Sequence, residues 1–479
     1  MSAHAAILTP KSIHIERSTV LKIRDTRPIA AFARLAVAVA LGLALSCTAA
    51  PSSIAYADVR TSDIVLGKTA DERGIDATEL PDIIATHAIV MTPNGTTYYE
   101  RDADAPIKIA SITKVMTALI ALENCELTEV ITVDHAAATV GESSVGLKEG
   151  DTLTMEEALV GLMVMSGNDT ATAIAIHVGA KIDPSSSNPY QTFLDAMNAR
   201  AKELGCVDTL FENPHGLDFG SWVGNMHSTT RDVMKIYAAA MQNEQFRAFD
   251  NSDRTTMQVT SADGTVRTTN LTVRNKIRGQ EGNIGGKTGS TYEAGTCFVG
   301  AFSREDGGEV YVAVFGSTDD ATRFNDTLAV ANWYYGHLAT VPFANTQTMR
   351  GDAPVLARAT CTDWTDKTAL VTVEDPSASV KVFSLSGDIE QTVDLKELGG
   401  TVQKGTDAGT ITYTQAGEAV GEMKLVAAEE VAGTNPFEWV MVQLDRALRF
   451  FQGKSSVAES SVLNEVPDPL AFDTWNAAA

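Results

Sequence analysis

The sequence predicts a mixed α/β (α+β) domain, then a small all-β sandwich domain and a C-terminal amphipathic helix. Between residues 79 and 342, long apolar helical stretches alternate with strand-like runs bounded by glycine. From about residue 353 the pattern changes to short alternating strands with turn signals, typical of a small sandwich over 353–431. The chain has 479 residues, enough for two or three such units with a sizeable core.

The N-terminal residues 1–57 are predicted to be a signal peptide. An apolar run from Leu35 to Cys47 follows several arginines, and Ala55-Tyr56-Ala57 fits the small-x-small cleavage rule. A retained membrane anchor is an alternative, although about 13 apolar residues are short for a span. A lipoprotein site at Cys47 is another, with a poor match to the residues before it. Residues 58–78 are predicted to be a polar linker.

The charge balance argues against a nucleic-acid partner. The whole chain carries a net charge of −24, and without residues 1–57 it carries 31 Lys and Arg against 59 Asp and Glu, a net charge of −28. Such a surface is soluble and repels nucleic acid. Four cysteines remain after residue 57, and the sequence leaves open whether they form disulfides or are buried free thiols: Cys125, Cys206, Cys297 and Cys361.

Several elements of the first domain are predicted in order along the chain. A hairpin with a Pro-Asn-Gly turn begins near residue 83, and Thr154 with Glu157 is a capping box for a helix. Strands follow residue 286, and a helix over 325–335 closes the domain. The remaining helices are predicted over residues 111–123, 154–180 in two parts, 191–205 and 228–243.

Three short strings in this domain carry the predicted chemistry. They are Ser111-Ile-Thr-Lys114, Ser166-Gly-Asn168 and Lys287-Thr-Gly289. A serine hydroxyl is a weak nucleophile and needs a nearby base. Residues i and i+3 of a helix are neighbours, so Ser111 and Lys114 are expected to meet. Burial and a second cation, Lys287, would lower the pKa of Lys114 enough for it to accept a proton.

The order and spacing of the strings resemble the serine-type D-alanyl-D-alanine carboxypeptidases, the low-molecular-weight penicillin-binding proteins. Longer strings support the resemblance: LVGLMVMSGNDTATAIA, FENPHGLD, HSTTRDV and GGKTGSTYEAGTCFVG. The resemblance implies a penicillin-binding/serine β-lactamase-like catalytic domain over residues 79–342. It also implies that the all-β domain is a spacer, and that the amphipathic helix over 435–453 lies at the membrane surface. The alternative for this segment is a helix packed on the sandwich.

The resemblance also implies roles for individual residues. Ser111 would be acylated and Lys114 would be its base, with Ser166 and Asn168 as the second motif. The backbone N–H groups of Ser111 and Ser290 would form an oxyanion hole. The substrate carboxylate would bind to the third motif, Lys287, Thr288 and Gly289, and to Arg323. An alternative for Arg323 is a solvated arginine that precedes a helix. The family's second basic residue is not placed by the sequence; Arg274 is near but loosely aligned.

Histidine and metal chemistry are not predicted. His215 and His227 invite a Ser-His-Asp interpretation, but Ser111 already has a lysine, so both histidines are expected to be structural. His135 and His177 have no metal-ligand spacing, and neither a metal nor another cofactor is expected.

The sequence therefore predicts an exported enzyme of the bacterial cell envelope, at the outer face of the plasma membrane or in the cell wall. It would remove the terminal D-Ala of peptidoglycan stem peptides, and β-lactams would bind covalently to it. The alternatives are a silent penicillin-binding sensor, a cell-wall-binding module, a transpeptidase or a serine β-lactamase. No E-x-x-L-N string lies between the second and third motifs, which disfavours the lactamase. A disordered tail over 454–479 is expected.

Overall fold

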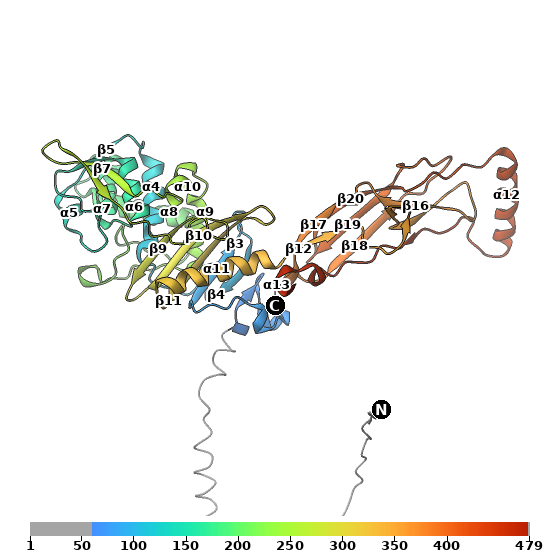
Figure 1. The fold of residues 1–479 in the computed structure, drawn as a ribbon, viewed down its shortest axis with the longest axis horizontal. Helices are drawn as coiled ribbons and strands as arrows, with labels where there is room; N and C mark the ends of the chain where they lie inside the picture. Colours follow the sequence, from blue (N-terminus) through green and yellow to red (C-terminus); the bar gives the residue numbers. More distant parts are fainter. Residues whose placement is uncertain (1–59, 478–479) are drawn as a thin grey trace, which may run out of the picture. The chain divides into compact units, whose positions relative to one another are not determined.

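The computed structural model describes residues 60–477, so the predicted signal peptide lies outside the described residues. A seven-stranded antiparallel sheet organises the first domain (Figure 1). Its strands, in spatial order, are β2 (Lys68–Thr69), β1 (Ile64–Val65), β4 (Thr97–Arg101), β3 (His87–Met91), β11 (Gly308–Ser317), β10 (Gly295–Arg304) and β9 (Asn283–Thr291).

Alternate residues of this sheet pack into two different cores, as the period of a strand requires. On one face, Phe298 and Phe302 of β10 pack with residues of α11 (Asp320–Gly336), including Trp333. On the other face, Val299 and Ala301 join the core of a helical region. The sheet therefore separates α11 from the helices that carry two of the three motifs.

The helical region contains α4 (Lys114–Asn124), of which most residues are buried. A four-stranded sheet lies beside it: β5 (Val130–Thr132), β6 (Thr152–Thr154), β7 (Thr256–Thr260) and β8 (Val266–Asn270). The other helices are α5 (His135–Thr139), α6 (Met155–Val164), α7 (Asn168–Ile182), α8 (Pro189–Glu203), α9 (Thr230–Ala240) and α10 (Glu244–Asp250).

The start of α6 differs in detail from the predicted capping box. Thr154 is the N-cap and its hydroxyl accepts the N–H of Glu157, as expected. The Glu157 carboxylate instead accepts from Arg254 and from the backbone N–H of Gln258. Only half of the capping box forms, because the Glu157 carboxylate is engaged in an ion pair with Arg254.

The predicted linker over residues 58–78 is wrong from residue 60 onward. Strand β1 pairs with β4, and α3 (Ala70–Arg73) follows β2. Asp63 is buried and accepts bonds from the Tyr99 hydroxyl, at 2.6 Å, and from the Arg101 guanidinium, at 2.7 Å. This buried acid pairs with two groups on β4, so the segment is part of the sheet rather than a connection to it.

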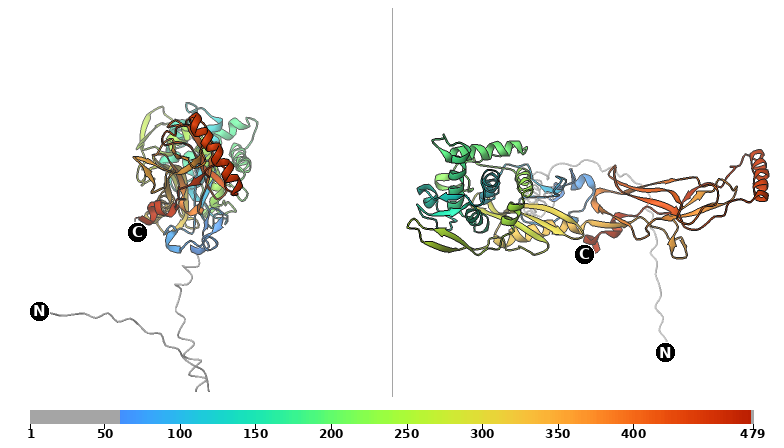
Figure 2. Two further views of the ribbon diagram at one scale, coloured as in Figure 1. Left: turned by 90° about the vertical axis from the view of Figure 1, so that its right-hand side faces the viewer. Right: turned by 90° about the horizontal axis from the view of Figure 1, so that it is seen from above.

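A second β region follows α11, and its strands run side by side in Figure 2. Strand β12 (Leu338–Pro342) pairs with β17 (Ser379–Phe383), so residues assigned to the catalytic domain from sequence join this region. A six-stranded sheet has the order β18 (Ile389–Leu395), β19 (Asp407–Gln415), β20 (Glu418–Ala427), β16 (Thr368–Val373), β15 (Ala357–Thr360) and β21 (Ser461–Val462), and β13 (Met349–Arg350) pairs with β14 (Ala353–Pro354).

Helix α12 (Pro436–Phe451) lies at one end of these strands (Figures 1 and 2). Val442 packs into the core of the β region, and the Arg446 side chain donates to the carbonyl of Thr362. The opposite side of the helix is exposed and mostly apolar. No helix among residues 60–477 is both long and apolar enough to cross a membrane.

The predicted disordered tail is wrong for residues 461–477. After α12 the chain forms β21, which pairs with β15, and then α13 (Thr474–Ala477). The buried Asp473 carboxylate contacts His337 Nδ1 at 2.8 Å and accepts from the Ser384 hydroxyl at 2.5 Å. Trp475 packs against His337. Buried polar bonds therefore hold the tail to the junction between α11 and the β region.

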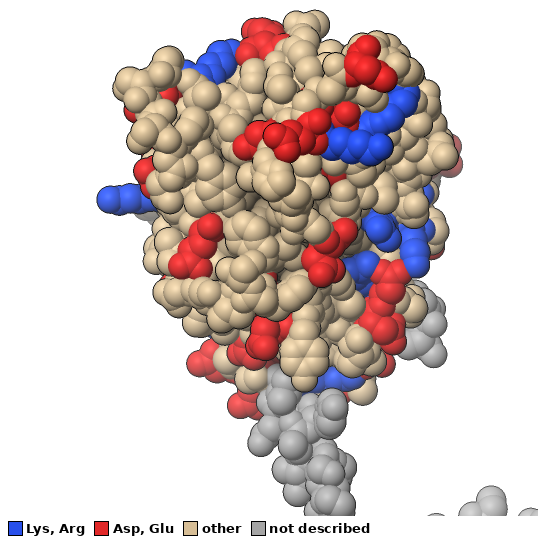
Figure 3. All heavy atoms as spheres, turned by 90° about the vertical axis from the view of Figure 1, so that its left-hand side faces the viewer, with Lys and Arg blue, Asp and Glu red and all other residues tan. Residues whose placement is uncertain are grey.

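Charged side chains are mixed on the face shown in Figure 3, where Lys and Arg lie among Asp and Glu rather than in a continuous basic surface. This face offers no extended basic patch of the kind that binds a nucleic-acid backbone.

Candidate active site

The first motif lies at a tight turn where the chain enters α4. Ser111 belongs to the 3₁₀ turn Ala110–Thr113, and Lys114 is the first residue of the helix. Ala110 has φ +46°, a left-handed conformation that costs a residue with a Cβ about 1–2 kcal/mol. The predicted contact is present, with Lys114 Nζ 2.8 Å from Ser111 Oγ. The turn presents a half-buried serine hydroxyl beside a fully buried amine.

The surroundings of Lys114 favour its neutral form. Its Nζ also lies 2.7 Å from the Asn168 amide oxygen and 2.9 Å from the His215 carbonyl, and both can only accept. A neutral amine has two N–H donors for these oxygens and one lone pair for the Ser111 hydroxyl proton. Burial and the nearby Lys287 hold the pKa of Lys114 well below its usual value. Geometry and electrostatics therefore agree that this lysine can accept a proton.

The second motif lies between α6 and α7. Ser166 has φ +66°, another left-handed conformation without glycine, of the kind often found at functional sites. Asn168 begins α7, and its side-chain amide donates to the carbonyl of Gly141 at 3.0 Å while its oxygen faces Lys114. Asn168 therefore bonds both to Lys114 and to the backbone at Gly141.

The third motif lies on the edge strand β9. Lys287 Nζ donates to Ser166 Oγ at 2.8 Å and to the carbonyl of Thr288 at 2.7 Å. Burial, with Arg323 and Arg274 nearby, lowers the pKa of Lys287 to about 7. Ser290 is exposed, whereas Thr288 is buried. The three motifs are thus joined by bonds between Ser111, Lys114, Asn168, Ser166 and Lys287.

Gly289 lies where β9 packs closely against the turn that precedes α4. A Cβ at this position would lie 2.9 Å from the carbonyl of Ile109 and 3.1 Å from Ile112 Cγ1. The glycine therefore lets β9 pack directly against the turn that carries Ser111.

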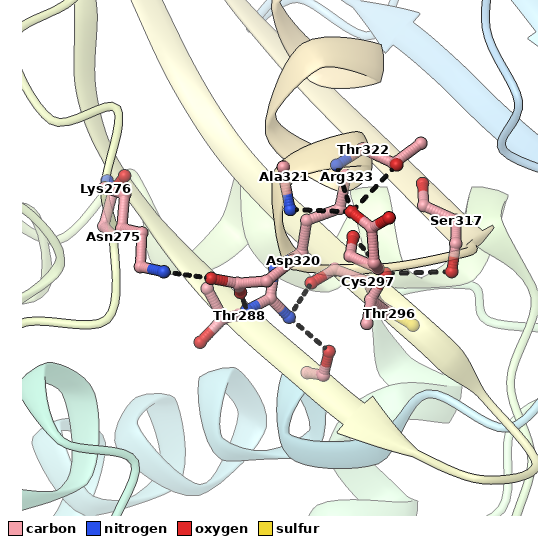
Figure 4. A network of polar contacts seen from close by, with 12 residues as sticks. Asn275, Lys276, Thr288, Thr296, Cys297, Ser317, Asp320, Ala321, Thr322 and Arg323 are labelled. Carbon is pink, nitrogen blue, oxygen red and sulfur yellow. Dashed lines mark hydrogen bonds and ion pairs between the residues drawn. The ribbon is translucent and has the colours of Figure 1, made fainter.

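Arg323 is buried beneath β9, so the alternative of a solvated arginine is wrong. Its guanidinium donates to the carbonyl of Gly289 at 2.8 Å and pairs with Asp320, which also binds Lys276 (Figure 4). Burial lowers the pKa of Arg323 from its usual value. The residue supports the K-T-G strand from behind and adds positive charge to the region around Lys287.

Arg274 is a cation that the sequence did not place. The residue is exposed, and its charge acts on both Lys287 and Arg323. No hydrogen bond or ion pair with another side chain of residues 60–477 occupies its guanidinium. In the sequence, the only sign of this residue was a loose alignment before β9. The fold, and not the spacing, brings Arg274 near Lys287 and Arg323.

The loop of residues 213–218 was also missed as part of the site. The Pro214 carbonyl accepts from the Thr117 hydroxyl at 2.6 Å, next to the bond between Lys114 and the His215 carbonyl. Asp218 accepts from the Thr291 hydroxyl at 2.7 Å, at the end of β9. The string NPHGLD was the sequence signal for this loop. The loop acts mainly through its backbone carbonyl groups, which cannot be recognised from the side chains in the sequence.

Asp169 fixes the position of the loop at residues 144–147. Its carboxylate accepts N–H bonds from Val145, Gly146 and Leu147 at 3.0 to 3.1 Å, and one from the Ser144 hydroxyl at 2.5 Å. The acid follows the second motif directly, so the loop and the motif are positioned as one unit.

The two histidines do not build a Ser-His-Asp arrangement. His215 Nδ1 accepts the N–H of Leu217, and its ring packs edge-on to Trp222. His227 contacts Asp208 at 3.0 Å. Within the described part of the chain, neither ring bonds to Ser111.

The family model described as D-alanyl-D-alanine carboxypeptidase, peptidase family S11, matches residues 75–319. The chain belongs to this family. It is a serine-type D-alanyl-D-alanine carboxypeptidase, a hydrolase, and the predicted penicillin-binding class of fold is confirmed.

Individual relatives support the assignment. The chain is 30% identical over 285 residues to a D-alanyl-D-alanine carboxypeptidase of Streptomyces sp. (strain K15), which covers 57% of this chain and 95% of that protein. It is 24% identical over 372 residues to the carboxypeptidase DacF of Bacillus subtilis, covering 76% and 89%. A solved variant of the Streptomyces K15 DD-transpeptidase aligns with TM-score 0.50 and 32% identity, covering 53% and 98%.

Proposed function

We propose that this carboxypeptidase acts in the bacterial cell envelope and removes the terminal D-Ala from peptidoglycan stem peptides through an acyl-Ser111 intermediate. The observation that carries the proposal is the position of Lys114 Nζ, 2.8 Å from Ser111 Oγ and bonded to two oxygens that only accept. This arrangement leaves the amine lone pair directed at the serine proton.

Acylation begins when Ser111 Oγ passes its proton to Lys114 and bonds to the carbonyl carbon of the penultimate D-Ala. The N–H groups of Ser111 and Ser290 stabilise the oxyanion that forms. The carbon–nitrogen bond then breaks, and the leaving amine takes the proton back through Lys114 and Ser166. The Ser166 hydroxyl accepts from Lys287 Nζ at 2.8 Å, which leaves its own proton free for donation to the leaving amine.

The positive charges around β9 would hold the substrate's terminal carboxylate. Lys287 and Thr288 lie on the strand, Arg323 lies behind it and Arg274 is exposed and unpaired within residues 60–477. A carboxylate bound here adds a negative charge beside Lys287, which favours its ammonium form. Binding substrate therefore charges the lysine that recognises it.

Water then hydrolyses the acyl-enzyme with Lys114 as the base. An amine from a second peptide attacks the same ester in transpeptidation, which is the activity named for the Streptomyces K15 structures. β-Lactams are expected to acylate Ser111 in the same way, with slow release.

The test is the intact mass of the purified protein after brief incubation with benzylpenicillin, beside a Ser111→Ala control, together with D-Ala release from a diacyl-Lys-D-Ala-D-Ala peptide. The expected result is a slowly lost adduct that requires Ser111, with release of D-Ala. An adduct without release identifies a sensor or a strict transpeptidase. Rapid penicillin hydrolysis identifies a lactamase. Absence of adduct, hydrolysis and release contradicts the acyl-Ser111 mechanism.

Helix α12 is proposed to bind the membrane surface. Its exposed apolar residues include Trp439, Leu444 and Phe451, which are 55%, 56% and 84% exposed. An apolar helical face of this kind partitions into the headgroup region of a bilayer. Sedimentation with vesicles containing anionic lipid should retain the protein, whereas replacing Trp439 and Leu444 by serine should release it. Equal retention of both proteins contradicts the proposal.

A further inference from the structure

Three side chains with metal-binding atoms meet away from the active site, at the far end of α4. Cys125 caps the C-terminus of α4, Glu129 precedes β5, and His177 lies on α7. Their ligand atoms all lie within 4.8 Å of one another. The sequence predicted no metal site, because positions 125, 129 and 177 have no recognisable ligand spacing and only the packing of α4 on α7 brings them together.

The carboxylate of Glu129 is already oriented as a metal ligand would be. Its Oε1 accepts from Lys181 Nζ at 2.5 Å and from the backbone N–H of Glu126 at 2.7 Å. Its Oε2 lies 3.4 Å from His177 Nε2. Ligating carboxylates are usually held by hydrogen bonds of this kind from outside the metal site. One oxygen is therefore fixed, and the other faces the imidazole.

The distances suit a tetrahedral zinc-type ion. Zinc bonds to nitrogen and oxygen at about 2.0–2.2 Å, which places two such ligands roughly 3.3 Å apart, close to the observed 3.4 Å. The Cys125 sulfur must approach by no more than about 1 Å to complete three corners. Glu129 and His177 are partly exposed, so the fourth corner is open to water.

We propose that Cys125, Glu129 and His177 bind a zinc ion, with a water molecule as fourth ligand. The Cys125 thiol loses its proton to solvent when the sulfur–zinc bond forms. The two helices that the ion joins both begin at the active site, where Lys114 Nζ and Asn168 Oδ1 are 2.7 Å apart. The ion would link α4 to α7 at Cys125, which lies about 11 residues, or roughly 16 Å, along α4 from Lys114.

The test is titration of the purified full-length protein with Co²⁺ as a probe, followed by displacement with Zn²⁺. We expect a thiolate-to-cobalt absorption band at one equivalent, visible bands of tetrahedral intensity, and loss of both on adding Zn²⁺. Cys125→Ser should abolish the thiolate band, and His177→Gln should weaken Co²⁺ binding by more than about 100-fold. Lys181→Gln, which removes the outer hydrogen bond, should weaken it by about 10–100-fold.

Cys206→Ser is the matched control, because Cys206 is a partly buried cysteine outside this cluster. It should leave the band unchanged. Penicillin acylation of each variant verifies that it is folded, since none of these residues lies in the active site. Zn²⁺ should raise the unfolding temperature of the unaltered protein and not that of Cys125→Ser. No thiolate band in the unaltered protein, or an equal band in Cys125→Ser, overturns the proposal.

Discussion

Gly216→Ala should damage the turn that carries Ser111 without changing any polar group of the site. Gly216 has φ +87°, and a Cβ there would lie 1.8 Å from the carbonyl oxygen of Ala110. Ala110 directly precedes Ser111, and the carbonyl of His215, the residue before the glycine, binds Lys114. The new methyl group must push one backbone away from the other, so either Ser111 or the acceptor for Lys114 moves.

The expected loss follows from the size of this movement. Carbon and oxygen atoms do not approach below about 3 Å, so the turn and the loop must separate by roughly 1 Å or more. A displacement of about 1 Å at a reacting group costs on the order of 100-fold in rate, or about 2.7 kcal/mol of activation free energy. The left-handed φ of an alanine at this position lowers the folding stability by about 1–2 kcal/mol more.

The assay is the second-order rate constant for acylation by benzylpenicillin, measured by intact mass, together with the unfolding temperature. Gly220→Ala is the matched control, because Gly220 has φ +61° and a methyl group added there would have no atom within 4 Å. The control should lose stability but acylate within about 3-fold of the unaltered protein. If Gly216→Ala acylates as fast as Gly220→Ala, the contact between the loop and the turn does not set the position of Ser111.

Three further substitutions test buried acids. Burial raises the pKa of Asp250 to about 7, and the Asp250 carboxylate in turn raises the pKa of Lys287. Asp250→Asn should therefore move the inflection of kcat/KM for D-Ala release to lower pH, and an unmoved profile would count against this coupling. Asp169→Asn removes the negative charge and places an NH2 donor where one of two accepting oxygens faces backbone N–H groups, so it should lower the free energy of unfolding in urea by about 2–4 kcal/mol. A loss under about 1 kcal/mol would show that the loop finds other partners. Burial raises the pKa of Asp473, but bonds such as that to His337 outweigh it and leave the pKa below its usual value, so its stabilisation is present at neutral pH and is lost as the pH falls through the acid range. The unfolding temperatures of the unaltered protein and Asp473→Asn should therefore converge from pH 7 towards about pH 3; a constant difference would refute this linkage.

Local spacing predicted the parts of the site that lie within one element. The contact of Ser111 with Lys114 follows from i and i+3 positions, and the lowered pKa of Lys114 follows from an apolar helix and a second lysine in the same domain. The N-cap at Thr154 is local in the same sense. These features depend on neighbours along the chain, which the sequence displays directly.

Features set by tertiary packing were not predictable. The His215 carbonyl has no residue-specific signature, and the closeness of Gly289 to Ile109 requires the strand and the turn to be placed first. Polar composition suggested a linker before residue 78, yet one buried acid, Asp63, ties that segment to Arg101. A few specific long-range bonds outweighed the average character of the segment.

The bond between His337 and Asp473 closes a loop of 136 residues, and this has a kinetic consequence. Contacts of such sequence separation are slow to form, because the entropy of loop closure is lost before the contact is made. Asp473 and Trp475 are synthesised well after the residues that they contact, so the packing around Trp333 and His337 waits for this late segment of the chain. A chain cut between Ser384 and Asp473 would leave the buried His337 without its carboxylate partner, and the resulting loss of stability would expose the product to proteolysis.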